Sequence, residues 1–173
     1  MRSKLGFLIA AVFAVTTARA EDVRMKGAAV GEWTMDYEAA LKLAKKKDLP
    51  VMLNFTGSDW CHWCIQIEEK VFSKSAWQDY AKSNAVLVTI DFPRRSELPE
   101  QIVARTERLQ IEYGVEGYPT LVVFDSDGAT LLGILGAGRG MTVDSFIKQF
   151  DQTIRHSSPR VAAYLKTKPA NAA

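Results

Sequence analysis

The sequence predicts an α/β domain in which helices cover both faces of a mixed central sheet. Short apolar runs typical of buried strands alternate with segments whose apolar residues recur at helical spacing, and this alternation favours parallel strands. A tight hairpin signal in the second half of the chain adds antiparallel pairing. With 173 residues, 47% of them hydrophobic and 24% charged, the chain fits one globular domain and is not a disordered protein.

The first twenty residues have the pattern of a secretory signal peptide. Arg2 and Lys4 precede the uncharged apolar run Leu5–Val15, and a small-x-small sequence ends at Ala20. The run is too short to cross a bilayer, which takes about 20 apolar residues. We therefore expect residues 1–20 to be removed, and the soluble product to be exported, in bacterial terms to the periplasm.

Removal of this segment changes the charge of the protein. The full chain has a formal net charge of +2, and the segment contains three basic residues and no acidic one. The mature chain of 153 residues therefore has a net charge of −1. Such a balance argues against a nucleic-acid partner.

The mature chain begins with a leader at residues 21–32, where a short edge strand is expected near Ala28–Trp33. A helix follows, ending at Lys46, because Thr34 and Asp36 are both good N-caps and the apolar residues behind them have helical spacing. Strand-like apolar runs, turn residues and further caps then alternate to the end of the domain. In order, they predict a strand at Val51–Phe55, a helix from Trp60 through Val71, a helix over Ala76–Lys82 capped by Ser73 or Ser75, a strand at Ala85–Ile90, a helix over Glu100–Tyr113, a strand at Thr120–Phe124, a turn at Ser126–Gly128, a strand at Ala129–Leu135 and a long helix capped by Thr142.

These elements place the folded domain at residues 33–155, and we expect it to be a monomer. The remaining segment, residues 156–173, contains Pro159 and Pro169. We expect it to be a flexible tail with at most one helical turn, near Val161–Leu165.

The two cysteines of the chain, Cys61 and Cys64, lie three residues apart where a strand and loop lead into a helix. Unpaired N–H groups and the positive end of the helix dipole favour a thiolate at Cys61, and Cys64 can then close a disulfide with it. A purely structural disulfide across so short a loop would stabilise the fold weakly. Zinc would need two further ligands, whereas copper(I) could use the two thiolates alone.

Three side chains around the cysteines are candidates for tuning the pair or binding a substrate. His62 can donate a hydrogen bond to the Cys61 sulfur, or it can be an uninvolved loop residue. Trp63 is expected to be exposed beside the sulfurs and to contact a substrate polypeptide. Trp60 either contributes to the same contact or packs on the domain and shapes the loop.

Two segments resemble the thioredoxin superfamily, and in particular its small exported disulfide oxidoreductases: Phe55–Cys64 (FTGSDWCHWC) and Tyr113–Thr120 (YGVEGYPT). The resemblance covers about residues 33–155 and implies the thioredoxin fold. It also implies that Pro119 is a cis-proline facing the sulfurs. Proline lacks an N–H that would compete there, which leaves the backbone of Tyr118 to bind an extended substrate. The Tyr118 side chain is large for this position and is expected to narrow access.

One position departs from the family pattern. Thioredoxins carry a buried aspartate on the strand before the active site, and the nearest match here is Asn54. An amide does not accept a proton at neutral pH. Proton transfer is then expected to use water or another carboxylate, such as Glu68 or Asp59.

Together these features predict an exported protein-disulfide oxidoreductase, with Cys61 as nucleophile and Cys64 as resolving thiol. We favour a reductase, which needs no organic cofactor and no metal but must be recharged by a membrane thiol carrier or another redox partner. An oxidase or isomerase using the same chemistry is one alternative. A copper-binding thiol chaperone, from a different functional class, is the other.

Overall fold

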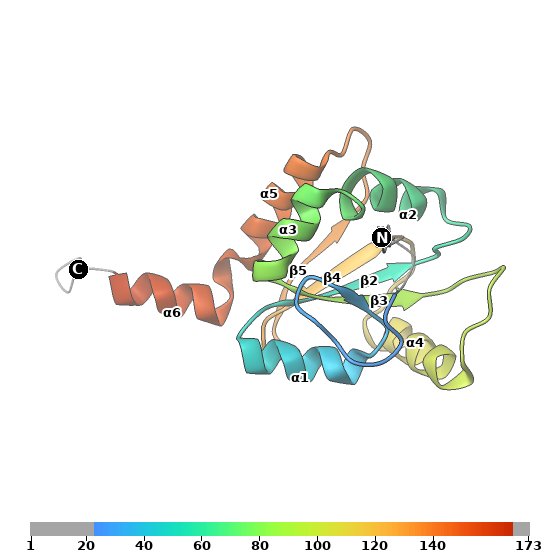
Figure 1. Cartoon of the computed structure of the whole chain (residues 1–173), viewed down its shortest axis with the longest axis horizontal. Coiled ribbons are helices and arrows are strands. Elements are labelled where there is room, and N and C mark those ends of the chain that lie inside the picture. Colours follow the sequence, from blue (N-terminus) through green and yellow to red (C-terminus); the bar gives the residue numbers. More distant parts are fainter. Residues whose placement is uncertain (1–22, 168–173) are drawn as a thin grey trace, which may run out of the picture.

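The computed structural model describes residues 23–167 and contains a five-stranded mixed sheet between two layers of helices (Figure 1). The strand order is β1-β3-β2-β4-β5, in which β1 and β2 run parallel to β3, while β4 is antiparallel to both β2 and β5. This arrangement confirms the predicted fold class. The strands are β1 (Trp33–Thr34), β2 (Val51–Thr56), β3 (Val86–Asp91), β4 (Thr120–Phe124) and β5 (Leu131–Gly136).

Each face of the sheet packs against its own group of helices, as Figure 1 shows. One core lies between the sheet and α1 (Tyr37–Lys47) with α4 (Glu100–Glu112). The other is covered by four elements that include the helix after the cysteines. They are α2 (His62–Ile67), the π-helical turn η1 (Glu68–Phe72), α3 (Ser75–Asn84) and α5 (Val143–Thr153).

The helix caps differ in part from those expected. Asp36 caps α1 by accepting the N–H of Ala39, whereas Thr34 belongs to β1. Thr142 caps α5 as predicted, in a reciprocal capping box with Ser145. The predicted serine cap of α3 is wrong, because the N-cap is Lys74, which makes no side-chain cap bond.

The helix that follows the cysteines ends earlier than expected. Its α-helical part stops at Ile67, and the chain continues as a π-helical turn rather than as α-helix to Val71. The wider π-helical turn directs the consecutive side chains of Val71 and Phe72 into the same core. Packing against the sheet therefore overrides the local preference for an α-helix.

The leader lies along the edge of the sheet. The strand expected near Ala28–Trp33 is shorter and lies later, as β1 at Trp33–Thr34. Arg24 bridges to Thr34 and Val30 bridges to Val86, so the segment before β1 covers this edge in two places.

The C-terminal helix α6 (Ser158–Thr167) is longer than the single turn expected and projects from the domain (Figure 1). Its first residue is anchored by the buried carboxylate of Asp125, which accepts both the backbone N–H and the hydroxyl of Ser158. The Arg160 guanidinium pairs with Asp151 on α5 and donates to the Asn84 side chain. Asp125 and Asn84 lie 33 and 76 residues from their partners in the sequence, so local pattern alone does not reveal these bonds.

Candidate active site

Cys61 and Cys64 form a disulfide at the start of α2, with their Cα atoms 5.2 Å apart. Cys61 is the N-cap residue of that helix, and its sulfur accepts the backbone N–H of Cys64 at 3.2 Å. Cys64 lies within the first turn and is buried. When the disulfide is reduced, this N–H and the helix dipole favour negative charge on the Cys61 sulfur.

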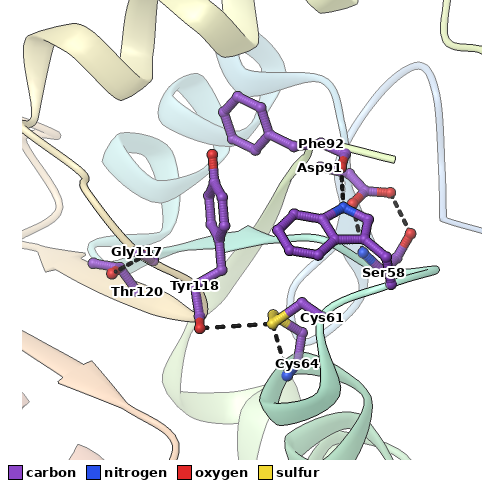
Figure 2. The surroundings of a disulfide bond; sticks show 9 residues. Ser58, Cys61, Cys64, Asp91, Phe92, Gly117, Tyr118 and Thr120 are labelled. Atoms are coloured by element: carbon purple, nitrogen blue, oxygen red, sulfur yellow. Dashed lines mark hydrogen bonds between the residues drawn. A yellow bond between two sulfur atoms is a disulfide. The ribbon is translucent and has the colours of Figure 1, made fainter. Parts of the chain in front are cut away.

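Tyr118 and Pro119 lie directly beside this pair. The bond between them is cis, and the Tyr118 carbonyl oxygen is 3.6 Å from the Cys61 sulfur (Figure 2). A disulfide sulfur has no proton to donate, so this approach is a contact in the oxidised form. In the reduced form, a Cys61 thiol at this place can donate to that oxygen.

The Tyr118 ring points away from the sulfurs and does not narrow their access as expected (Figure 2). It packs against Phe92 at a centroid distance of 5.0 Å and meets the Trp60 ring edge-on at 5.8 Å. Its hydroxyl accepts a hydrogen bond from Gln110, and partial burial raises the pKa of the phenol. The ring is thus a support for the loop, and only its backbone faces the disulfide.

Trp60 is held in place by the segment that follows β3. Its indole Nε1 donates to the carbonyl oxygen of Phe92 at 2.7 Å, and the Arg94 guanidinium lies over its ring, 3.7 Å from the centroid. A Cβ added to Gly57 would lie 2.5 Å from the indole, so only glycine allows this ring position. Trp60 therefore both shapes the loop and contributes a surface next to Cys61.

Two carboxylates fasten the loop before Cys61 to the end of β3. The buried carboxylate of Asp91 accepts the backbone N–H and the hydroxyl of Ser58 (Figure 2). The carboxylate of Asp59 accepts the backbone N–H groups of Arg94 and Arg95. Sequence reasoning missed Asp91 and Arg94 as parts of this site, because both lie more than thirty residues from their partners and carry no local motif.

His62 and Trp63 are exposed on the first turn of α2. In the oxidised form, the His62 ring bonds with the Gln66 side chain at 2.9 Å rather than with the Cys61 sulfur. The Trp63 ring meets the His62 ring edge-on, and 37% of Trp63 is exposed. Ile65 is exposed to the same extent. Two exposed apolar side chains therefore lie on α2, one between the cysteines in the chain and one directly after them.

Asn54 is buried on β2, between Thr89 and Leu121 of the neighbouring strands. Alternation along the strand turns it toward the same side as Met52, the side that α2 covers. Its side-chain oxygen has no hydrogen-bond partner among the described residues. The position resembling the family's buried acid thus holds a neutral amide below the active-site helix.

Of the two carboxylates expected to replace that acid, Asp59 is the weaker base. The backbone N–H groups of Arg94 and Arg95 hold the pKa of the Asp59 carboxyl below its usual range. Glu68, in contrast, lies one helical turn after Cys64 and lines a pocket of about 630 Å³ together with Trp33 and Phe72. Desolvation raises the pKa of the Glu68 carboxyl above its usual range, but neither cysteine lines this pocket, so the carboxylate is not placed at the disulfide.

The raised pKa predicts how Glu68→Gln changes stability with pH. Because the pKa of Glu68 is higher in the folded than in the unfolded protein, its protonated carboxyl favours folding. This contribution to stability is complete below the ordinary pKa, 4.5, and is lost as pH rises through the folded-state pKa. We therefore expect the variant to gain melting temperature relative to the original chain at pH 7 but not at acidic pH below 4.5. Thermal unfolding across this range measures it, with Glu69→Gln as a control of equal charge. A difference that stays constant with pH contradicts the prediction.

A family model described as a thioredoxin-like domain matches residues 37–151, more than half of the chain. The chain belongs to this thioredoxin-like family. The matched region contains the cysteine pair, Pro119 and every strand except β1.

Two curated relatives come from Chlamydia pneumoniae. This thioredoxin-like chain is 34% identical over 111 residues to the disulfide bond reductase DsbH, and the match covers 64% of this chain and 66% of that one. It is 23% identical over 136 residues to the thioredoxin-related protein DsbJ, covering 76% of this chain and 39% of DsbJ. The chain thus spans just under two thirds of one relative and well under half of the other.

Solved structures support the same fold. A DsbH oxidoreductase structure is 28% identical, with a TM-score of 0.67 over 79% of this chain and 94% of that one. A thioredoxin from Thermus thermophilus, 22% identical, has a TM-score of 0.54 over 76% of this chain and 91% of its own.

Two further kinds of feature are absent from the region between Val23 and Thr167. No cluster of three or more His, Cys, Asp or Glu side chains in this region has the arrangement of a metal site. No helix within it combines the length and hydropathy required to cross a bilayer.

Proposed function

We propose that this protein is a thiol–disulfide oxidoreductase that acts on protein disulfides. One observation carries the proposal: a disulfide whose first sulfur caps a helix, accepts a backbone N–H and lies beside the carbonyl oxygen that precedes a cis-proline. A structural disulfide would need none of these neighbours, whereas sulfur exchange uses each of them.

The proposed reaction starts from the reduced pair. The Cys61 thiolate attacks one sulfur of a substrate disulfide, forms a mixed disulfide and releases the other substrate sulfur, which takes up a proton. Cys64 then loses its proton and attacks the Cys61 sulfur, so that the Cys61–Cys64 disulfide forms and the second substrate thiol leaves. Two electrons pass from the protein dithiol to the substrate.

The surroundings of the pair suit an extended polypeptide substrate. The backbone of Tyr118, which precedes cis-Pro119, can pair with such a segment as an added strand would. Trp63, between the two cysteines, and Ile65, directly after them, offer exposed apolar surface on α2. Contacts of these two kinds recognise the backbone and bulk of a polypeptide more than its particular sequence.

We infer that electrons flow toward the substrate, as in a reductase. The name of the 34% identical relative, a disulfide bond reductase, supports this direction. The signal-like first twenty residues support export to the periplasm. A reductase in that compartment must receive electrons from a membrane dithiol carrier or another redox partner, because each turnover leaves the pair oxidised.

Insulin reduction tests the function. With dithiothreitol as the reductant, the protein comprising residues 21–173 is expected to precipitate the insulin B chain much faster than dithiothreitol alone. The double variant Cys61→Ser/Cys64→Ser should precipitate it no faster than dithiothreitol alone. Equilibration with glutathione tests the direction, and a potential near that of strong protein oxidants would contradict a reductase. Stoichiometric copper in the freshly purified reduced protein, together with no insulin reduction, would instead favour the thiol chaperone.

A further inference from the structure

Arg94 presents a positive charge at a defined place beside the cysteine pair. Its guanidinium lies 3.7 Å from the centroid of the Trp60 ring, and Trp60 directly precedes Cys61 in the chain. The loop that carries Arg94 is also held by its own backbone, since the N–H groups of Arg94 and Arg95 both donate to Asp59. The charge is therefore positioned by several contacts rather than carried on a freely moving side chain.

The stacked guanidinium keeps its hydrogen-bond donors available. Stacking occupies its flat face, while its N–H groups point outward in the plane and can bind a carboxylate in a bidentate pair. Within residues 23–167, no carboxylate lies at ion-pair distance from it. The nearby acids are engaged elsewhere, Asp59 with backbone N–H groups and Asp91 with Ser58.

The position of Arg94 places it along the path of a substrate. The Tyr118 carbonyl oxygen is 3.6 Å from the Cys61 sulfur, and the Tyr118 ring meets Trp60 edge-on at 5.8 Å. Because Trp60 directly precedes Cys61 in the chain, a polypeptide bonded to the Cys61 sulfur is expected to pass near Trp60 and the Arg94 guanidinium that lies over its ring.

Resting on the proposed oxidoreductase function, we propose that Arg94 is a specificity-determining residue that binds an acidic side chain close to the reactive cysteine of the substrate. The positive surface that Arg94 forms on the Trp60 ring is narrow. A pocket of about 390 Å³ between the same loop and α4 is lined by Glu97 and Glu107, which would repel an acidic group. The selected substrates therefore carry a carboxylate near the disulfide, rather than a long acidic tract.

Arg95 supplies a matched control. It is the next residue in the loop, is exposed like Arg94, and its side chain forms no ion pair with the described residues. Arg95→Gln and Arg94→Gln change the net charge equally, but only the second removes the guanidinium from the Trp60 ring.

Two disulfide-linked peptides test the inference, identical except for Glu or Gln next to the reactive cysteine. The rate of thiol release by the reduced protein is measured in single turnovers. At low ionic strength, the unaltered protein is expected to prefer the Glu peptide about three-fold, as for an exposed ion pair, and to lose this preference at high salt. Arg94→Gln should lower the ratio to about one, Arg94→Glu should invert it, and Arg95→Gln should leave it unchanged.

The outcomes separate the inference from the function on which it rests. Equal rates for both peptides with the unaltered protein overturn the role of Arg94 while leaving the oxidoreductase in place. A uniform slowing of both peptides by Arg94→Gln also overturns it, because Arg94 then acts only through the position of Trp60. If the protein releases thiol from neither peptide, the proposed oxidoreductase function is contradicted, and the role of Arg94 in choosing substrates is contradicted as well.

Discussion

Replacing Cys64 with serine is expected to trap the protein in a mixed disulfide with its substrate. Cys61 caps α2 and receives the N–H of residue 64, a backbone donor that serine retains, so the first attack remains possible. Serine is too weak a nucleophile at neutral pH to attack the resulting disulfide. Multiple turnovers of insulin reduction should fall to the background rate, and non-reducing electrophoresis should show a covalent protein–substrate species.

The reverse variant is the control. Cys61→Ser lacks the sulfur that contacts the Tyr118 carbonyl, and its remaining thiol, Cys64, is buried within the first helical turn. It should abolish turnover and accumulate almost no mixed disulfide. Accumulation with Cys61→Ser, and none with Cys64→Ser, would exchange the roles assigned to the two cysteines.

The largest loss of stability is expected from Trp77→Ala. Trp77 on α3 is fully buried, and its ring packs against Phe72, Phe146 and Phe150 at centroid distances of 5.8, 5.0 and 5.4 Å. Truncation removes the apolar contacts of a large side chain and leaves a cavity, which typically costs about 3–5 kcal/mol. Because domains of this size are stable by about 5–15 kcal/mol, denaturant unfolding should show a large fall in the transition midpoint.

Trp63→Ala is the matched control for this prediction, since it makes the same substitution at an exposed tryptophan. Its unfolding free energy should change by no more than about 0.5 kcal/mol, as is usual at the surface. If Trp77→Ala fails to fold, Trp77→Phe keeps part of the ring contact and should show a smaller, measurable loss. Equal losses for the Trp63 and Trp77 variants would contradict the different roles that their burial indicates.

These two tryptophans show where sequence reasoning works and where it stops. Trp63 follows directly on Cys61-His62, and that spacing was enough to predict an exposed residue at the site. Trp77 lies in a polar stretch of α3, and only the packing of η1 and α5 around it reveals a core residue. Its burial depends on residues about seventy positions later, and no local pattern contains them.

The same division applies to the loops around the disulfide. Turn residues predicted the sharp approach to Cys61, but the partner of Ser58 is Asp91 and the partner of Trp60 is the segment Phe92–Arg94. These contacts exist because β2 and β3 are adjacent and parallel, so the ends of both strands lie at the same edge of the sheet. Likewise, the expected hydrogen bond from His62 to sulfur gives way in the oxidised form to one with Gln66, a helical neighbour four residues away.

By itself, the sequence determined the α/β class, the order of the elements and the cysteine pair at a helix start. All three depend on local spacing: the periodicity of apolar residues, turn chemistry, and two thiols within one helical turn. The tertiary structure alone decided how the loops beside the sulfurs are held, namely the Tyr118 ring turned away from the disulfide, the bonds of Asp91 to Ser58, and Arg94 stacked on Trp60. The reason is physical, since these residues come from separate strands and loops that meet only when the sheet brings their ends together.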